Sequence, residues 1–337
     1  MNSNPSKILV VLSAGLGDFL IAVPALKALR RRYPAARITL AVSSKTLSYA
    51  QRCPDANRVV ALDAFHLFSP AAAKQLRLIC ELRAERFDLA LNLYEISTFA
   101  GMLKMRALFA AISPALCAGR DTDGRGSFYD IRSPDSPADG ADHGEHYSRL
   151  VDLLGCQTRP QDKAALWINA DARQAAEDFL SANQARPGEA FLGIHPGSAR
   201  RSRHWLPGRF AQTADALSRS CGLRVVILGG AGEAGLAEEV ASLMEHNPLL
   251  SAGKLSFESS LALIQRLRLL ICTHSSLMHA ANAFSVSFVA LQGISDMRRD
   301  GPYQPAPGRY VVIHTKNLRT LESDEVIAAG LELLKNG

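Results

Sequence analysis

Continuous apolar runs that end in glycine-rich or polar turns constrain this chain more than any other feature of its sequence. Residues 8–12 (ILVVL) form such a run, and the turn SAGLGD at 13–18 follows directly. Residues 191–195 (FLGIH) repeat the arrangement in the second half, where Pro-Gly-Ser follows. A strand without alternation of apolar and polar residues is typical of a parallel sheet covered by helices on both faces. The pattern predicts an α/β protein.

The same order of strands and helices recurs in both halves and predicts two doubly wound domains. In the first half we expect strands at 8–12, 38–42, 58–62 and 89–93 and helices at 19–32, 45–52, 71–83 and 147–154. In the second half we expect strands at 191–195, 224–228, 269–272 and 286–291 and helices at 209–220, 236–246, 259–266, 277–283 and 322–335. Pro24 predicts a kink or a late start of its helix. Residues 119–145 are rich in Gly, Asp, Ser and Pro, which predicts a long loop.

Length and composition exclude several classes of protein. The 337 residues, 47% of them hydrophobic, are enough for two buried cores, which excludes disordered, collagen-like and disulfide-scaffold proteins. A net charge of +6 favours an anionic ligand or surface, but no run of Lys and Arg resembles a nucleic-acid-binding arm, and we expect no nucleic-acid partner. The six cysteines have no CxxC spacing, so we expect free thiols in a reducing cytoplasm and no metal site.

The apolar stretch at 8–26 resembles a secretory signal peptide. Asp18, flanked by Gly15 and Gly17, places a charge in its middle, and a strand, a turn and a helix explain every residue there. No other segment approaches the ~18 apolar residues of a membrane-spanning helix. We therefore expect a cytoplasmic protein.

Ligands of doubly wound domains bind at the carboxyl ends of the strands, and four polar clusters lie there. The first holds Gly17 and Asp18. Asp18 is either a capping residue near a helix start or a general base that accepts the proton of an attacking hydroxyl.

The second cluster, HPGSARRSRHW at 195–205, has a hydroxyl at Ser198 and arginines that include Arg200 and Arg203. Hydroxyl, backbone N–H and guanidinium groups together bind phosphate. A solvated basic loop is the alternative. The position at a strand end favours the phosphate site.

The third and fourth clusters also follow strands. The third is a glycine turn, in which Gly229 and Gly230 would let a nucleotide approach and Glu233 would bind ribose hydroxyls. The fourth is the polar turn THSSLMH at 273–279, whose hydroxyl and N–H groups would hold a diphosphate. Its predicted ligands are His274, Ser275, Ser276 and Leu277. His279 is either a further ligand or a residue packed in the core.

These strings, in this order, resemble glycosyltransferase family 9, best known for ADP-heptose:lipopolysaccharide heptosyltransferases. The family's G-D turn and PAL helix match GDFLIAVPAL at 17–26. Its hPGs…K-x-W string matches 195–205, with Arg203 where a lysine is usual. Its lGG.gE turn matches VILGGAGE at 226–233, and its aGk.sl element matches AGKLS at 252–256.

The resemblance implies a GT-B fold, in which two Rossmann-like doubly wound domains face a central cleft. Residues 1–165 would bind the acceptor and residues 166–320 the nucleotide-sugar donor. The last helix, within 321–337, would pack back on the first domain.

The resemblance also assigns roles to single residues. Asp18 matches the family's catalytic base, Ser198 and Arg203 match groups that grip the donor diphosphate, and Glu233 matches a carboxylate at the nucleoside. His279 matches the family's late histidine, while Gly17 and His146 would lie on the acceptor side. The chain departs from the family's nDTGpmH string, because His274 replaces the Asp and Ser276 replaces the Gly.

The leading hypothesis is an inverting, metal-independent glycosyltransferase that moves heptose from ADP-heptose to a hydroxyl of an acceptor such as a lipopolysaccharide core sugar. The nucleotide sugar is a co-substrate, and no cofactor is expected. A peripheral contact with the cytoplasmic face of the inner membrane would fit a glycolipid acceptor. One alternative is a related transferase that uses another nucleotide sugar on a protein or small molecule. A second is a donor-binding homologue without catalysis.

Overall fold

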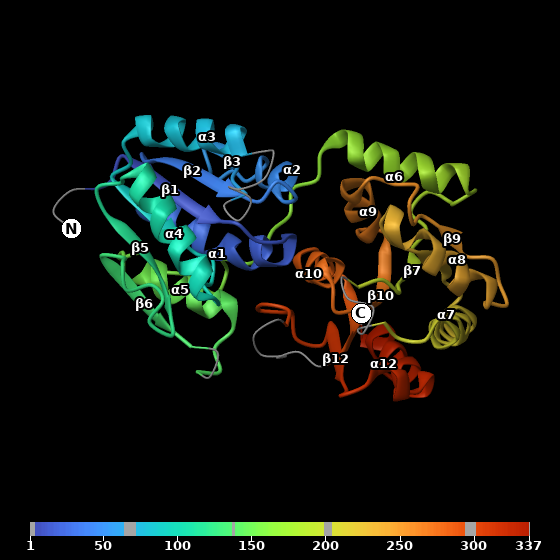
Figure 1. Cartoon of the computed structure of the whole chain (residues 1–337). Coiled ribbons are helices and arrows are strands. Elements are labelled where there is room, and N and C mark those ends of the chain that lie inside the picture. The colour runs from blue at the N-terminus through green and yellow to red at the C-terminus, as the bar shows by residue number, and fades with distance from the viewer. Residues whose placement is uncertain (1–3, 64–71, 137–138, 199–203, 294–300, 337) are drawn as a thin grey trace. The chain divides into compact units, whose positions relative to one another are not determined.

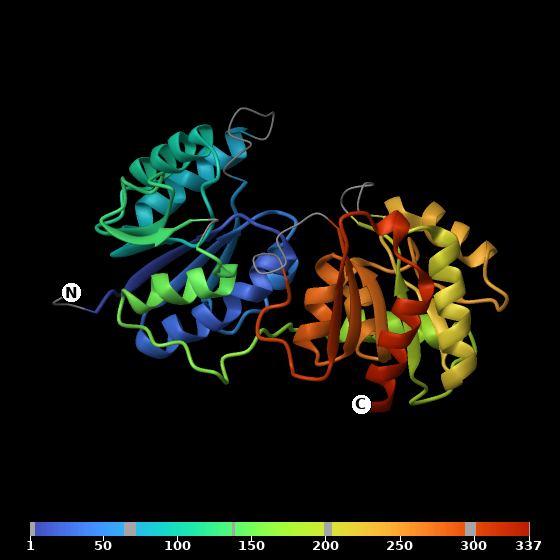
Figure 2. The same ribbon diagram turned by 90° about the horizontal axis from the view of Figure 1, so that it is seen from below.

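Two parallel six-stranded sheets organise the chain, one in each of two compact units, residues 1–164 and 165–337. The computed structural model describes residues 4–63, 72–136, 139–198, 204–293 and 301–336. Each unit is an α/β domain with helices on its sheet (Figures 1 and 2), as the apolar runs predict.

The sheet of the first unit has the strand order β3-β2-β1-β4-β5-β6. Its strands are β1 (Lys7–Leu12), β2 (Arg37–Val42), β3 (Arg58–Ala61), β4 (Leu89–Asn92), β5 (Cys117–Thr122) and β6 (Ile131–Asp135). Its helices are α1 (Leu16–Arg32), α2 (Leu47–Ala50), α3 (Ala72–Glu85), α4 (Phe99–Ile112) and α5 (His143–Asp152).

The helices cover both faces of this sheet. Figure 2 shows α1 and α5 on one face and α3 and α4 on the other. Leu9 and Val11 of β1 belong to the core under α3 and α4, and their neighbours in β1 are buried as well. Successive strand residues point to opposite faces, so burial of both sets explains the uninterrupted apolar run.

The second unit repeats this plan with the strand order β12-β11-β10-β7-β8-β9. Its strands are β7 (Phe191–His195), β8 (Arg224–Ile227), β9 (Leu249–Leu250), β10 (Leu267–Thr273), β11 (Ser287–Gln292) and β12 (Tyr310–His314). Its helices are α6 (Ala170–Ala182), α7 (Pro207–Cys221), α8 (Ala234–Ser242), α9 (Phe257–Ile264), α10 (Ser276–Ala283) and α12 (Ser323–Asn336), with short 3₁₀ turns η3 (Ala231–Glu233) and η4 (Leu318–Thr320).

The predicted long loop at 119–145 is wrong. It contains most of strand β5, all of strand β6 and the start of α5, and β5 pairs with β6 in parallel from Ala118↔Ile131 to Thr122↔Asp135. The strands carry buried polar residues, so they lack the apolar run that marks β1. Pro134 is tolerated because β6 is the edge strand. Helices α4 and α6 and strands β9 and β12 are further elements that the apolar pattern did not predict.

Two helices differ from expectation at particular residues. Helix α1 begins at Leu16, three residues before the predicted start, and continues through Pro24. Helix α12 packs on α7, β10 and β11 of its own unit, with Val326 and Leu333 in that core. The indole N–H of Trp205 donates to the carbonyl oxygen of Leu321 at 2.9 Å, which fixes the start of α12 there. The expected packing of this helix on the first domain stays a prediction.

Candidate functional site

A cavity of about 390 Å³ opens at the carboxyl ends of β7, β8 and β10 in the second unit. Three of the four predicted clusters meet there, because parallel strands end on the same edge of the sheet. The lining comprises His195, Ser198, Gly229, Gly230, Ala231, Glu233, Leu255, Phe257, Ser260, His274, Ser275, Ser276 and Leu277.

Glu233, His195 and Ser275 form a hydrogen-bonded chain across the cavity wall. His195 Nε2 lies 3.3 Å from Glu233 Oε2, and His195 Nδ1 lies 3.1 Å from Ser275 Oγ. The hydrogen bond from His195 holds the pKa of the Glu233 carboxyl below its usual value. An ionised carboxylate only accepts, so we assign the ring hydrogen to Nε2, and Nδ1 then accepts the hydrogen of the Ser275 hydroxyl.

Glu233 also holds the two glycine turns in place. Its Oε2 accepts a hydrogen bond from the backbone N–H of Gly230 at 2.8 Å. A Cβ atom on Gly197 would lie 1.8 Å from Glu233 Oε1, so a larger residue at that position would displace the Glu233 carboxylate. The Thr273 hydroxyl donates to the Gly197 carbonyl oxygen and joins this turn to β10.

Helix α10 begins at this cavity with Ser275 as its N-cap. The Ser275 side chain makes no capping hydrogen bond to the helix, because its hydroxyl is directed to His195. The N–H groups of a first helical turn have no partner within the helix, and together with the helix dipole they favour an anion. Ser276 and Leu277 of this turn line the cavity. The end of α10 can therefore bind phosphate oxygens.

Ser198 supplies a second polar group to the cavity. Its Oγ atom is buried and has no hydrogen-bond partner among the described residues. A buried hydroxyl without a partner is costly. A ligand oxygen in the cavity would satisfy it.

Three predicted donor residues are not among the described residues that line the cavity. Arg200 and Arg203 fall outside the described residues. His279 is buried on α10, with its ring centroid 6.1 Å from that of His274, and is not among the cavity-lining residues that the structure describes.

Sequence reasoning missed the apolar part of the wall. Leu255 precedes α9 and Phe257 begins it, and both line the cavity, as does the polar Ser260 in the first turn of α9. The AGKLS string just before α9 marks this segment, but it does not reveal which side chains face the cavity.

In the first unit, Asp18 lies half-buried in the first turn of α1, where Gly15 is the N-cap and Gly17 precedes it. Burial, and second the negative charge of Asp18, raises the pKa of both Tyr94 and Tyr147. The carboxylate therefore lies close to two phenol groups. A first-turn carboxylate is also favoured by the helix dipole, so this position fits both interpretations of Asp18.

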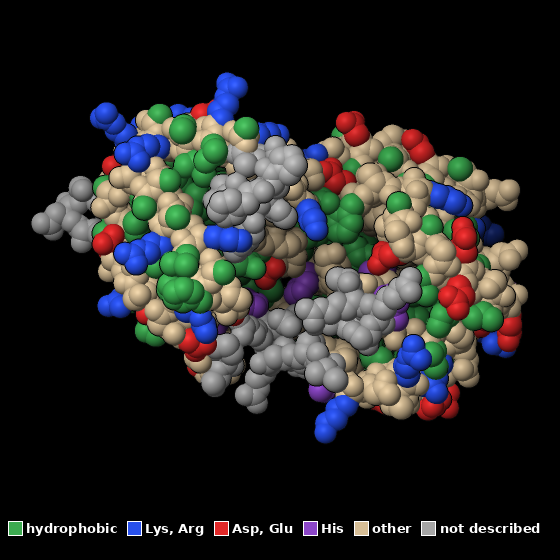
Figure 3. Space-filling view, viewed as in Figure 1, with side chains coloured by type: hydrophobic (Ala, Val, Ile, Leu, Met, Phe, Trp, Pro, Cys, Tyr) green, Lys and Arg blue, Asp and Glu red, His purple; other side chains and the backbone are tan. Residues whose placement is uncertain are grey.

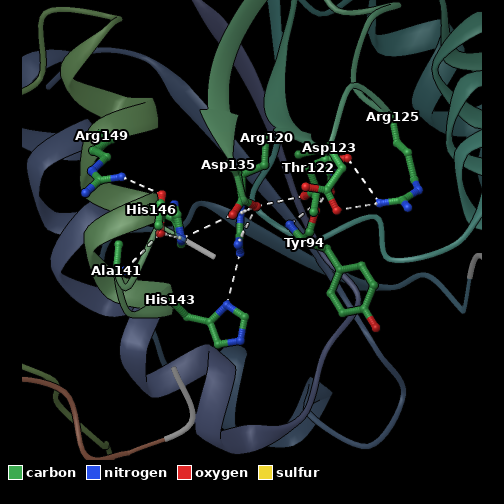
Figure 4. A network of polar contacts seen from close by, with 12 residues as sticks. Tyr94, Arg120, Thr122, Asp123, Arg125, Asp135, Ala141, His143, His146 and Arg149 are labelled. Carbon is green, nitrogen blue, oxygen red and sulfur yellow. Dashed lines mark hydrogen bonds and ion pairs between the residues drawn. The ribbon is translucent and has the colours of Figure 1, made fainter. Parts of the chain in front are cut away.

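His146, predicted for the acceptor side, belongs to a buried ionic network (Figure 4). Its Nε2 lies 3.1 Å from Asp135 Oδ1, and its side chain is buried. Asp135 Oδ2 lies 2.6 Å from Arg120 Nη2 and accepts a hydrogen bond from the Thr122 hydroxyl at 2.7 Å. Nη1 of Arg120 lies 3.1 Å from Nδ1 of His143. The network joins β5, β6 and α5, and an acceptor contact of His146 stays a prediction.

Within the described ranges, no group of three His, Cys, Asp or Glu side chains could hold a metal ion. None of the helices that the structure describes is long and apolar enough to cross a bilayer.

Comparison with known proteins gives consistent matches. The model of glycosyltransferase family 9 (heptosyltransferase) matches residues 75–327. Lipopolysaccharide heptosyltransferase 3 of Escherichia coli is 24% identical over 284 residues, which cover 83% of this chain and 81% of that protein.

Solved structures match over both units. The crystal structure of a family 9 glycosyltransferase from Veillonella parvula has a TM-score of 0.85 at 22% identity and covers 99% of this chain and 100% of that one. The structure of E. coli ADP-heptose lipopolysaccharide heptosyltransferase II has a TM-score of 0.75 at 20% identity and covers 98% and 99%. The matches confirm the predicted fold of two Rossmann-like domains.

Proposed function

Because the chain belongs to glycosyltransferase family 9, we propose that it transfers heptose from ADP-heptose to a hydroxyl group of a lipopolysaccharide core sugar, with inversion at the anomeric carbon. It is a glycosyltransferase with the GT-B fold. The observation that carries the donor proposal is the cavity at the start of α10. It combines an open helix N-terminus, a buried hydroxyl that lacks a partner among the described residues, and a glycine turn held by Glu233.

The diphosphate of the donor would lie against the first turn of α10. Backbone N–H groups of Ser276 and Leu277 and the hydroxyl of Ser198 would bind its oxygens. Arg203 and Arg200 would neutralise the charge that develops on the leaving diphosphate. The N-terminus of α10 and the two arginines would thus stabilise the leaving diphosphate without a metal or a cofactor.

The nucleoside would lie between the glycine turn and α9. Gly229 and Gly230 allow close approach of the ribose, and Glu233 is ionised and can accept its hydroxyl hydrogens. Leu255 and Phe257 offer an apolar wall to the base.

Asp18 would act as the general base. As the acceptor oxygen attacks the anomeric carbon, its hydroxyl proton would pass to the Asp18 carboxylate. The bond from the anomeric carbon to the diphosphate oxygen breaks at the same time, and ADP leaves from the opposite face. Attack opposite the leaving group inverts the configuration.

We expect Asp18→Ala to lower turnover by ~10²–10⁴-fold, the usual contribution of a general base, with donor affinity near that of the unaltered enzyme. The assay measures ADP release and acceptor glycosylation with ADP-heptose. Equal turnover of the variant and the unaltered chain would remove Asp18 from the mechanism. Absence of transfer by the unaltered chain itself would favour a non-catalytic homologue.

One observation favours a second candidate donor. His274 lines the cavity where the family pattern has an aspartate, and an imidazole can donate to phosphate where a carboxylate would accept from sugar hydroxyls. A different nucleotide sugar, with a protein or small molecule as acceptor, is the alternative function. Stabilisation by UDP, GDP or dTDP in preference to ADP would select it.

The acceptor would be a glycolipid, which would place the enzyme at the cytoplasmic face of the inner membrane. The net charge of +6 fits an anionic acceptor or membrane surface. Gly17 and His146 stay proposed acceptor-side residues.

A further inference from the structure

Three of the six large hydrophobic side chains that the described residues expose lie on two neighbouring helices of the first unit. Leu76 of α3 is 56% exposed, and Phe99 and Leu103 of α4 are 68% and 48% exposed. Single exposed hydrophobic residues are ordinary, but a group on one surface marks a site of interaction.

Two of these side chains lie on the exposed face of one helix, and the third is exposed on the helix packed beside it. Phe99 and Leu103 are four residues apart and lie on the same face of α4. The opposite face of α4, with Leu108 and Phe109, packs into the core. A hydrogen bond of 3.0 Å from Arg83 to the Ala111 carbonyl oxygen ties α3 to α4.

Basic residues accompany these side chains on both helices. Helix α4 contains no acidic residue. The first half of α3 is also free of acidic residues; Glu81, one turn further on, lies within 3.5 Å of both Arg77 and Arg58. We define the α3–α4 face as Lys74, Leu76, Arg77, Phe99, Leu103, Lys104 and Arg106. Figure 3 shows hydrophobic side chains over α3 and α4 interspersed with Lys and Arg.

We propose that the α3–α4 face docks the enzyme on an anionic membrane. Aromatic and aliphatic side chains enter the boundary between headgroups and acyl chains, while Lys and Arg extend their charged ends to the headgroups. Each basic residue near an anionic leaflet adds attraction that salt screens. The combination of exposed apolar and basic side chains matches this partner better than a neutral one.

The position of the face links it to the proposed reaction, and this step rests on the proposed function. A small cavity of about 150 Å³, lined by Tyr94, Thr98 and Gly101 among others, lies at the start of α4 beside Phe99. Tyr94 is close enough to Asp18 for the charge of Asp18 to raise its pKa. Strands β1 and β4 are parallel neighbours, so the segments that follow them, with Asp18 and with Phe99, leave the same edge of the sheet. A lipid-linked acceptor that leaves the membrane at Phe99 would approach Asp18 along this edge.

Vesicle co-sedimentation of the full chain tests the proposal. The vesicles are phosphatidylcholine alone, or phosphatidylcholine with phosphatidylglycerol at a 7:3 ratio (roughly the anionic content that draws polybasic surfaces), at low and high salt. We expect the unaltered chain to bind the anionic vesicles. The double variants Phe99→Ser/Leu103→Ser and Lys104→Glu/Arg106→Glu should each bind them at least about tenfold more weakly. High salt should weaken binding of the unaltered chain.

Leu153→Ser is the matched control, since Leu153 is 55% exposed at the end of α5, on the other face of the same sheet. Its vesicle binding should equal that of the unaltered chain. All variants should keep the unfolding temperature and the nucleotide affinity of the unaltered chain.

Three outcomes would overturn the proposal. The first is that the unaltered chain fails to bind the anionic vesicles, and the second is that the Leu153→Ser control loses as much vesicle binding as the α3–α4 variants. The third outcome is that the chain is a dimer which Phe99→Ser/Leu103→Ser dissociates, because a second copy of the chain would then cover this face. Failure of the proposed function appears separately, as vesicle binding by a chain that binds no nucleoside diphosphate.

Discussion

Asp135→Asn should destabilise the first unit strongly, because this carboxylate neutralises an arginine that has no access to solvent. Arg120 is 0% exposed, its Nε donates to Asp135 Oδ2 at 2.8 Å, and its Nη2 lies 2.6 Å from the same oxygen. The Thr122 hydroxyl and His146 also contact this carboxylate. Asparagine keeps the size of the side chain but removes the negative charge that neutralises Arg120.

The magnitude follows from burial. Removing one partner of a buried ion pair costs about 3–5 kcal/mol. For a unit of this size, each kcal/mol lowers the unfolding temperature by about 2–4 °C, so we expect a fall of roughly 6–20 °C. Calorimetry or urea unfolding monitored in the first unit measures it.

Asp123→Asn is the control, because its ion pair with Arg125 at 3.2 Å is solvent-exposed and such pairs contribute about 0–1 kcal/mol. If Asp135→Asn destabilises no more than this control, the network does not hold β5, β6 and α5 together, and the reasoning is refuted.

Two further predictions concern the same network and the donor cavity. Burial, and second the charge of Arg120, lowers the pKa of His143 to about 4, so as the pH falls the unfolded chain takes up a proton before the folded chain does. The free energy of unfolding should therefore decline as the pH falls from ~6.5 toward about 4. His143→Gln should flatten this decline in urea unfolding measured across pH. Gly197→Ala should displace Glu233 and weaken the binding of a nucleoside diphosphate at least about tenfold, a loss of ~1.4 kcal/mol of binding free energy that calorimetry measures. Gly208→Ala is the control, because a Cβ atom there meets no atom within 4 Å, and it should bind with the affinity of the unaltered chain. Equal affinities in the two variants would contradict the role of Glu233.

Apolar strands buried on both faces were predictable from sequence, and the strands that carry polar residues in the interior were not. The apolar run at 8–12 predicts β1, because side chains on both faces of that strand are buried in apolar cores. In β5 and β6 the interior holds Arg120 and Asp135, whose charges cancel each other only in the folded structure. Periodicity of hydrophobic residues carries no trace of such a pairing.

The donor cavity was predictable in its polar parts because its clusters stand at strand ends, and strand ends converge in a parallel sheet. What sequence could not provide is how these clusters contact one another. The direction of the Ser275 hydroxyl toward His195, and the contact of Glu233 with Gly197, depend on three segments that lie far apart in the chain. The place of α12 on its own unit likewise depends on the contact of Trp205 with Leu321.

A thermal-shift panel with ADP, UDP, GDP and dTDP, followed by ADP-heptose, tests the central claim most directly. A ligand at 100 times its dissociation constant stabilises by about 2.7 kcal/mol. The account predicts an upward shift of several degrees (about 2–4 °C per kcal/mol) with ADP and a larger one with ADP-heptose, and both shifts should shrink in Gly197→Ala. Preference for another nucleotide would contradict the ADP-heptose assignment, and no shift with any of them would contradict the cavity as a donor site.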